Sequence, residues 1–271
     1  MWRPSQGTEE RISMSELAKA FDHGKAFIAF VTCGDPDLET TGKVVRSMVE
    51  NGADLIELGI PFSDPTAEGP VIMDADKSAL DGGVTTDDIF RFTKELRKDI
   101  HVPMLYMTYA NVVFHYGAEE FCRKAADAGV SGLILPDVPF EEKADFDSVC
   151  SKYGIDLVSM VAPTSEDRIA DIAKEAKGFL YVVSSLGVTG TRTSITTDLR
   201  PMISLIRKNT DIPCAVGFGI STPEQCRNMA ELSDGAIVGS GIVKIIAKHG
   251  KDSAGPVGEF VKSMKDAIRD L

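Results

Sequence analysis

The fold is decided by a helix-to-strand joint that reads Asn51-Gly52-Ala53-Asp54-Leu55-Ile56-Glu57-Leu58-Gly59. A glycine after an amphipathic stretch is typical of a helix that stops in the left-handed conformation. The apolar run after this glycine is too short for a core helix and indicates a buried strand. Two later joints look alike, Ala128-Gly129-Val130-Ser131 and Ser233-Asp234-Gly235-Ala236. The chain therefore uses the same helix-to-strand unit several times.

Outward from this joint, short apolar runs alternate with longer amphipathic stretches in both directions. The predicted strands occupy residues 27–31, 54–58, 103–108, 132–135, 157–161, 179–183, 213–216 and 235–238. The predicted helices occupy residues 38–50, 86–98, 118–128, 141–152, 165–177, 198–208, 223–231 and 241–248. Eight β–α units in about 250 residues predict a (β/α)8 TIM barrel of the α/β class. An open, doubly wound sheet shows the same alternation and is the alternative.

The two ends of the sequence add further elements to this barrel. Residues 13–23 predict an extra N-terminal helix that plugs the bottom of the barrel, and residues 255–271 predict an extra C-terminal helix. No linker or low-complexity segment divides the sequence. We therefore expect one domain over residues 1–271, with the barrel core at about 26–250.

Composition and charge exclude several classes of function. The 271 residues include 41 acidic and 29 basic ones, a net charge of −12, which disfavours nucleic-acid and membrane partners. No apolar run reaches the length of a membrane span, and the N-terminus lacks the apolar core of a signal peptide. Five cysteines without CxxC spacing and four scattered histidines indicate no metal site. Reduced, buried thiols would suit a cytoplasmic protein.

Glu57 is the first candidate functional residue. If Ile56 and Leu58 pack outward, strand alternation turns Leu55, Glu57 and Gly59 into the barrel. Desolvation there raises the pKa of a carboxyl group and suits it to proton transfer. The alternative is a structural glutamate paired with a base, but Arg192 is the only basic residue in the strand-end segments.

The segment after this strand, residues 60–70, is long for a βα loop and contains three prolines. Its stiffness suits a loop that holds two more carboxylates, Asp64 and Glu68, in place. Turn formation and solvation are the alternative explanation for these two residues.

Three glycine-rich segments predict an anion site. They are the loop over residues 184–192, the segment Gly217-Phe218-Gly219-Ile220-Ser221, and Gly239-Ser240-Gly241 at the start of a helix. Glycines let backbone amides approach an anion, and TIM barrels bind phosphate after their last two strands. Tight turns alone are the alternative. No lysine ends a strand, which disfavours a Schiff-base aldolase and favours acid–base cleavage or isomerisation of a phosphorylated compound.

Apolar residues near these loops complete the candidate pocket. They could line a flat apolar pocket or belong to the ordinary core, and they are Phe30, Met107, Tyr109, Tyr181 and Phe218.

At these positions the sequence resembles the tryptophan synthase alpha subunit family. The resemblance is carried by Glu57-Leu58-Gly59-Ile60-Pro61-Phe62-Ser63-Asp64-Pro65, Tyr109-Ala110-Asn111, Pro136-Asp137-Val138-Pro139, Gly187-Val188-Thr189-Gly190, Gly217-Phe218-Gly219-Ile220-Ser221 and Gly239-Ser240. It extends in register from residue 27 to residue 248. It implies a lyase of tryptophan biosynthesis that cleaves indole-3-glycerol phosphate to indole and D-glyceraldehyde 3-phosphate by general acid–base catalysis.

The resemblance also implies roles for individual residues. Glu57 matches the catalytic acid–base, and Glu68 stands where many members carry the aspartate that contacts the indole N–H. Thr189 matches the loop threonine that meets Asp64 when the site closes. Substrate contacts are implied for Tyr181 and Thr189 and, around the phosphate, for Gly190, Gly219, Gly239 and Ser240. From their places near the loops we also expect Phe30, Tyr109 and Phe218 to contact the substrate. The chain departs from the family pattern at Glu68 and at Ser185-Leu186, where some members carry Arg-Ser.

The family's partner is a beta subunit that binds pyridoxal phosphate and receives indole through a tunnel. The resemblance therefore implies an alpha2beta2 heterotetramer in which the alpha chain itself binds no cofactor. The implied contact surface comprises the 61–65 loop, the Asn111 region and the 184–192 loop. Two alternatives stay open at this point: a stand-alone lyase that releases free indole, and a regulatory partner that mainly activates beta chains. The intact Glu57 argues against the second.

Overall fold

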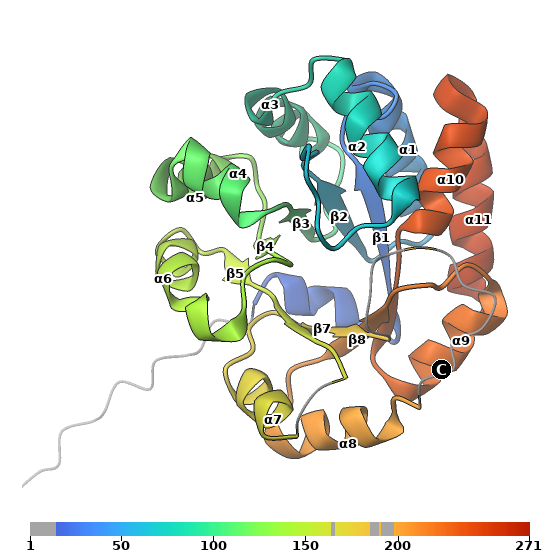
Figure 1. Cartoon of the computed structure of the whole chain (residues 1–271). Helices are drawn as coiled ribbons and strands as arrows, with labels where there is room; N and C mark the ends of the chain where they lie inside the picture. Colours follow the sequence, from blue (N-terminus) through green and yellow to red (C-terminus); the bar gives the residue numbers. More distant parts are fainter. Residues whose placement is uncertain (1–14, 164–165, 185–189, 191–197) are drawn as a thin grey trace, which may run out of the picture.

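The computed structural model describes residues 15–163, 166–184, 190 and 198–271, and it contains one nine-stranded parallel sheet. Its strand order is β5-β4-β3-β2-β1-β9-β8-β7-β6 (Figure 1). The strands are β1 (Ala26–Thr32), β2 (Leu55–Gly59), β3 (Met104–Met107), β4 (Gly132–Ile134), β5 (Asp156–Leu157), β6 (Ser159–Val161), β7 (Leu180–Val183), β8 (Cys214–Gly217) and β9 (Gly235–Val238).

The sheet closes through the two short strands at the ends of this order. β5 pairs with β4 and β6 pairs with β7, and only Val158 separates β5 from β6 along the chain. The Val158 N–H donates to the Leu133 carbonyl oxygen at 2.9 Å. The predicted (β/α)8 barrel is thereby confirmed, but the single strand predicted over 157–161 is wrong. This segment changes its pairing partner from β4 to β7, and the ladder breaks where the change occurs.

The predicted helices are present with shifted ends, and they surround the barrel. They are α1 (Leu38–Glu50), α3 (Thr86–Leu96), α5 (Ala118–Asp127), α6 (Ala144–Lys152), α7 (Glu166–Lys174), α8 (Arg200–Asn209), α9 (Pro223–Leu232), α10 (Ser240–His249) and α11 (Ala254–Asp266). The start predicted for α6 is wrong, because residues Phe140–Glu142 form a separate 3-10 turn, η2. The final helix α11 ends before residue 271.

Two further helices lie in segments for which the sequence predicted neither a helix nor a strand. α2 (Pro70–Asp81) follows the 60–70 segment and begins with a proline in its first turn. α4 (Ala110–Tyr116) directly follows β3 and precedes α5. Proline suits the first turn of a helix, because the N–H that it lacks has no partner there in any case. Pro70 therefore ends the loop by starting a helix.

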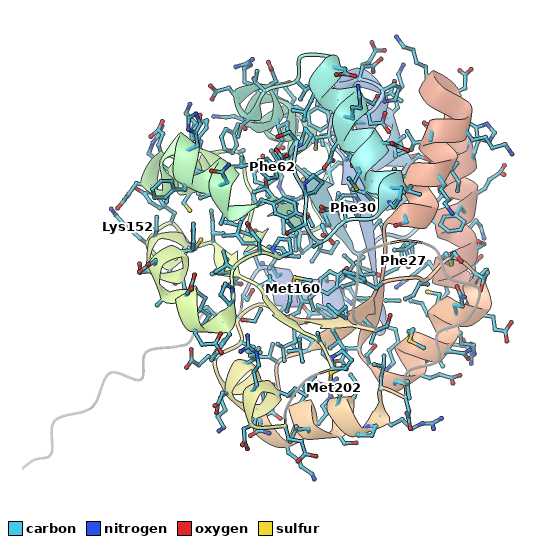
Figure 2. The ribbon with its side chains drawn as sticks, viewed as in Figure 1. Phe27, Phe30, Phe62, Lys152, Met160 and Met202 are labelled. Carbon is cyan, nitrogen blue, oxygen red and sulfur yellow. The ribbon has the colours of Figure 1, made fainter. Side chains whose placement is uncertain are left out.

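Strand alternation divides the apolar residues between two layers. Ile56 and Leu58 pack outward against the helices, whereas Leu55 belongs to the cluster inside the barrel. Figure 2 shows Phe30 and Met160 near the centre of the barrel and Lys152 at its periphery. No helix in the described part of the chain is both long and apolar enough to cross a membrane.

The chain's leading element closes the bottom of the barrel. It is a 3-10 helix, η1 (Leu17–Phe21), which is shorter than the extra helix predicted over 13–23, and residues 13 and 14 lie outside the described part of the chain. The Leu17 side chain is completely buried. It occupies the space beside Gly132 and Gly178, where an added Cβ would lie 2.5 and 2.9 Å from Leu17 Cδ1. The Ser15 hydroxyl donates to Asp156 and holds the plug to β5. The predicted plug at the barrel bottom is therefore present in a shorter form.

Candidate active site

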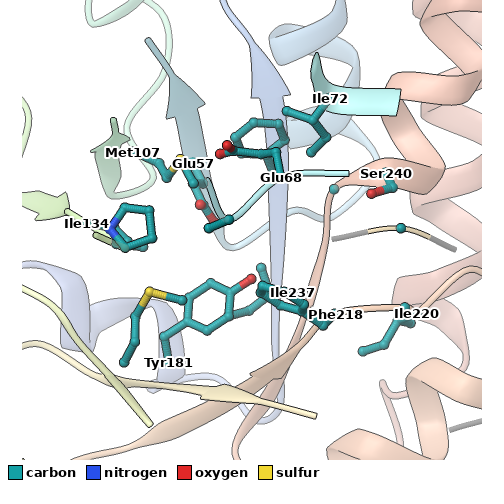
Figure 3. A pocket seen from close by; sticks show the side chains of 17 residues that line it. Glu57, Glu68, Ile72, Met107, Ile134, Tyr181, Phe218, Ile220, Ile237 and Ser240 are labelled. Atoms are coloured by element: carbon teal, nitrogen blue, oxygen red, sulfur yellow. The ribbon is translucent and has the colours of Figure 1, made fainter. Parts of the chain in front are cut away.

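A cavity opens at the carboxyl ends of the strands (Figure 3), and its empty space, counted together with its opening to solvent, is about 610 Å³. Nine of the predicted site residues line it: Phe30, Glu57, Glu68, Tyr181, Gly190, Phe218, Gly219, Gly239 and Ser240. The rest of the lining is mostly apolar and includes Met107, Ile134, Pro136, Met160, Ile220 and Ile237. Segments that lie far apart in the sequence thus meet around one hollow, at the end of the barrel where this fold carries its chemistry.

Glu57 projects from β2 into this cavity, as alternation along the strand predicts. Its side chain is 3% exposed, and its Oε2 atom is buried without a hydrogen-bond partner among the described residues. Burial, and secondarily the charge of Glu68, raise the pKa of Glu57 to about 8. A carboxyl group in this position is mostly protonated at neutral pH, so it can donate a proton and afterwards accept one.

Glu68 approaches the cavity from the loop between β2 and α2. The Tyr109 hydroxyl donates to Glu68 Oε2 and in turn accepts the Ala67 N–H at 3.0 Å. The Phe62 ring stacks on Tyr109 with 5.3 Å between ring centroids. Burial raises the pKa of Glu68 to about 7, and the hydrogen bond from Tyr109 opposes this shift. Tyr109 therefore lies behind Glu68 and positions it, rather than lining the cavity.

A third buried carboxyl group, Asp76 on α2, was missed by sequence reasoning. Thr32 Oγ1 donates to Asp76 Oδ1 at 3.5 Å, and the Phe62 N–H donates to the same side chain. Burial, followed by the charge of Glu68, raises the pKa of Asp76 to about 8. The available signal was helical spacing, because Asp76 shares the buried face of α2 with Ile72, Ala75 and Ala79.

The opposite side of the cavity is built from backbone. Gly219 follows β8 with φ +84°, and Phe218 before it has φ +77°. Residues other than glycine rarely adopt a positive φ, and here it sets the direction of the backbone amides in this turn. Gly239 precedes α10, whose first-turn amides at Ser240 and Gly241 point out of the helix end. A Cβ on Gly239 would lie 3.2 Å from the Phe30 ring. Free amides and a helix N-terminus suit an anion, and the position agrees with the predicted phosphate site.

Two predicted loop-closure residues are not placed at the cavity. Asp64 is exposed, and its side chain accepts the Ser63 hydroxyl at 2.5 Å. Thr189 lies outside the described residues, as do residues 185–188 and 191–197, and only Gly190 of that loop is described. The proposed contact between Thr189 and Asp64 therefore stays a prediction.

All five cysteines are buried and free. Within residues 15–163, 166–184, 190 and 198–271, no group of three His, Cys, Asp or Glu side chains could hold a metal ion.

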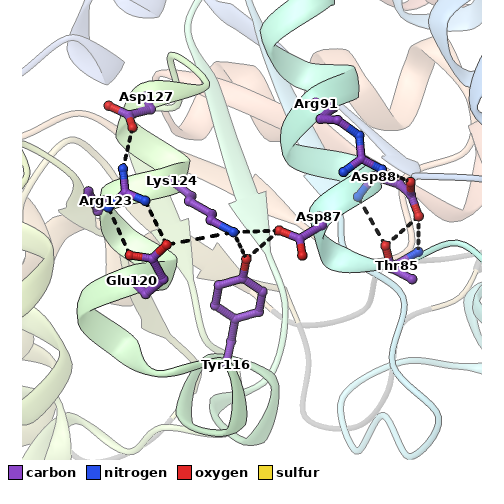
Figure 4. Close-up of polar contacts among 9 residues, drawn as sticks. All are labelled: Thr85, Asp87, Asp88, Arg91, Tyr116, Glu120, Arg123, Lys124 and Asp127. Atoms are coloured by element: carbon purple, nitrogen blue, oxygen red, sulfur yellow. Dashed lines mark hydrogen bonds and ion pairs between the residues drawn. The ribbon is translucent and has the colours of Figure 1, made fainter.

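A second group of carboxylates lies on the outer helices (Figure 4), and none of its members lines the cavity. Asp87 on α3 accepts hydrogen bonds from Tyr116 Oη at 2.5 Å and from Lys124 Nζ at 2.8 Å. These hydrogen bonds lower the pKa of Asp87. Asp88 forms a capping box with Thr85, which lowers its pKa as well. We call Asp87, Asp88 and their partners the outer-helix cluster, and its geometry explains how α3, α4 and α5 are held together.

The barrel and the buried carboxyl groups at its mouth define an enzyme of the TIM-barrel class. The model of the tryptophan synthase alpha chain family matches residues 17–269. The chain belongs to this family.

Individual relatives agree with the family match. The tryptophan synthase alpha chain of Lacticaseibacillus casei is 44% identical over 255 residues, covering 94% of this chain and 96% of the relative. The Methanosarcina barkeri protein of the same name is 47% identical over 264 residues, covering 96% and 98%. The solved tryptophan synthase subunit alpha from Legionella pneumophila superposes with a TM-score of 0.84 at 33% identity, covering 96% of this chain and all of that one.

Proposed function

We propose that this chain cleaves indole-3-glycerol phosphate to indole and D-glyceraldehyde 3-phosphate in a retro-aldol reaction. As a member of its family, the chain is a lyase of tryptophan biosynthesis. The observation that carries the proposed chemistry is Glu57, a buried carboxyl group with a pKa of about 8 and an unpartnered oxygen beside an apolar cavity. Proton transfer to and from a carbon-based substrate requires a group of this kind.

The cavity orients the substrate along its length. The phosphate lies at the amides of Gly219, Gly239 and Ser240, with Gly190 closing over it, and the indole ring lies among the apolar side chains. Phe218 and Tyr181, whose ring centroids are 6.3 Å apart, form one wall of this apolar part. The ring carbon that bears the glycerol chain then faces Glu57.

Glu57 serves both proton transfers. Its protonated form donates to the ring carbon that bears the side chain, which makes the ring cationic and leaves Glu57 as a carboxylate. The carboxylate then removes the proton from the adjacent glycerol hydroxyl. The carbon–carbon bond breaks, its electron pair restores the indole ring, and the hydroxyl carbon becomes the aldehyde of glyceraldehyde 3-phosphate. Glu57 ends the cycle protonated.

Glu68 stabilises the cationic ring. As a carboxylate it accepts the indole N–H, and this interaction is strongest when the ring is positively charged, so it favours the transition state. The hydrogen bond from Tyr109 favours the charged form of Glu68 despite its burial. The longer side chain, in place of the family's aspartate, is held back by Tyr109.

The proposal includes a partner and a compartment. Indole passes to a beta subunit within an alpha2beta2 complex in the cytoplasm, and pyridoxal phosphate is bound by that subunit alone. The family resemblance assigns the contact with the beta subunit to the 61–65 loop, the Asn111 region and the loop that contains Thr189.

Indole release from indole-3-glycerol phosphate tests the proposal directly. The purified chain is assayed alone and with a beta subunit, and indole is quantified by chromatography. We expect slow release by the chain alone and a marked acceleration with the beta subunit. Absence of indole under both conditions would refute the proposed reaction, and strong turnover that a beta subunit leaves unchanged would refute the proposed complex.

A further inference from the structure

A second cavity adjoins the first, and the empty space in it, counted together with its opening to solvent, is about 430 Å³. Pro136 and Met160 line both cavities, so their side chains form the partition between them. Most of the residues on the far side are apolar, among them Val138, Phe140 and Ile172, and Lys143 and Ser159 are the polar residues of the lining. We call this second space the annex.

The annex exists because the barrel wall is interrupted at Val158. Up to this residue the chain pairs with β4, through the bond to the Leu133 carbonyl, and from Ser159 onward it pairs with β7. The two sides of the seam separate above this point. Ser159 and Met160 line the annex on one side of the seam, and Leu135 and Pro136 line it on the other.

The partition lies on the side of the cavity opposite the predicted phosphate site, where the ring end of the substrate would be. In the ring of strands, β4 lies across the barrel from β9, which leads into the phosphate-binding turn at Gly239. Figure 3 shows Ile134 and Ser240 on opposite sides of the cavity, with Glu57 between them. A substrate with its phosphate at Ser240 and its reacting carbon at Glu57 therefore directs the far edge of its ring toward Pro136 and Met160.

We propose that the annex accepts small apolar substituents on the benzenoid ring of the substrate and that Met160 sets this specificity. The inference rests on the proposed function, because that function defines which end of the substrate reaches the partition. Methionine is unbranched and adapts its shape readily, so Met160 can move aside without displacing the backbone of β6.

The charge around the annex selects the class of substituent. Lys143 also lines the annex, but its ammonium group is 3.1 Å from Glu175 and lies over the Phe140 ring, 4.6 Å from the centroid. Its charge is thus already balanced, and the annex offers apolar contact instead of an anion site. Chloro and methyl groups fit this surface, whereas a carboxylate would have to compete with Glu175 for Lys143.

The test is a series of substrates with chlorine or methyl at each of the four benzenoid carbons. In a closed pocket, one additional group of this size lowers kcat/KM by roughly 10–200-fold. We expect this penalty at the carbons that face closed wall and a loss of less than about tenfold at the carbon that faces Met160. Similar penalties at all four carbons would overturn the proposal.

Two variants locate the effect. Val138 lines the annex and does not line the substrate cavity, so Val138→Phe fills the annex from its far side. We expect this variant to cleave the parent substrate normally and to reject the favoured substituted substrate by at least about tenfold. Val138→Leu is the matched control and keeps the tolerance. Met160→Ala joins the two spaces, and we expect it to accept a trifluoromethyl group at the same carbon.

Failure of the annex and failure of the proposed reaction give different results. If the parent substrate is cleaved but Val138→Phe leaves the substituent tolerance unchanged, the annex is refuted and the reaction stands. If the parent is not cleaved, calorimetric titration with indole and the chloroindoles decides the annex independently. Tighter binding of one chloroindole, lost in Val138→Phe, supports it, and equal binding of all of them refutes it. The melting temperature of each variant confirms that it is folded.

Discussion

The buried carboxyl groups near the cavity and those of the outer-helix cluster are the same functional group, but their pKa values are shifted in opposite directions. Burial, followed by the charge of Glu68, raises the pKa of both Glu57 and Asp76 to about 8. Asp87 has its pKa lowered by Lys124 and Tyr116. The difference shows what each region is built for. Partnered carboxylates at the surface tie helices together, whereas carboxyl groups that are buried beside one another retain protons at neutral pH, and Glu57, which lines the cavity, can exchange its proton with a substrate.

The largest difference is expected from removing the proton-transfer group. Glu57→Gln keeps the size and polarity of the side chain, but it cannot exchange a proton. A positioned acid–base group contributes ~10²–10⁴-fold, and Glu57 serves two transfers, so kcat should fall by at least ~10⁴-fold. KM should change little, because the phosphate site is untouched. Steady-state kinetics measure both, with Asp87→Asn as the surface control. A Glu57→Gln enzyme that kept a third of wild-type turnover would remove Glu57 from the mechanism.

The second-largest difference between the two regions is expected in the pH dependence of protein stability. Glu57 and Asp76 have folded-state pKa values of about 8, above those of the unfolded chain, so the folded protein retains protons that the unfolded chain loses. Their contribution is fully present below about pH 4 and is lost as the pH rises toward 8, with a slope of about 1.4 kcal/mol per pH unit for each group inside that window. Urea denaturation at intervals from pH 5 to pH 9 measures this slope.

The variants separate the two contributions. Glu57→Gln should flatten the slope, whereas Asp87→Asn should leave it unchanged. The lowered pKa of Asp87 gives stability that is lost only on acidification, as the pH falls through that pKa. A slope that is equal in the wild type and in Glu57→Gln would show that Glu57 is ionised in the folded protein.

A smaller effect is expected from restoring the commoner family residue at position 68. Glu68→Asp shortens the side chain by one methylene. The shorter carboxylate cannot contact both Tyr109 and the substrate, so turnover should fall by roughly 10–100-fold. KM should change less than kcat, since the contact strengthens in the transition state. In combination with Tyr109→Phe the losses should not add, because both changes disturb one contact. Fully additive losses would show that Tyr109 does not position Glu68.

The smallest effect is expected at the surface. Asp87→Asn weakens the contact with Lys124, and exposed ion pairs contribute little to stability. The melting temperature should fall by less than about 4 °C, and kcat should not change. Differential scanning calorimetry and the indole assay measure the two quantities. A large loss of activity would mean that the packing of α3, α4 and α5 affects the position of the residues that line the cavity, so the two regions would not be independent.

Glu57 shows what the sequence can predict about the site. Its inward direction follows from strand alternation alone, since Ile56 and Leu58 pack outward. The nine predicted residues that line the cavity follow from the ends of the predicted strands and from the family resemblance. These inferences succeed because periodicity and strand order are local or topological properties of the chain.

Asp76 and the seam at Val158 show where such prediction stops. The prolines of the 60–70 segment read as a loop, so α2 and the carboxyl group it buries were not expected. The interruption at Val158 arises because the chain pairs with β4 before this residue and with β7 after it. The local sequence pattern does not indicate such a change of pairing strand. The cavity partition formed by Met160 follows from that change and could be recognised only in three dimensions.

The plug at the barrel bottom has a consequence for the order in which the protein folds. Leu17 needs the space beside Gly132 and Gly178, and Ser15 bonds to Asp156, 141 residues further along the chain. None of these partners has left the ribosome when the plug is synthesised, and the plug gains its contacts only when β4, β5 and the segment at Gly178 are in place. The plug is therefore made before its partners and is among the last elements of the barrel to dock.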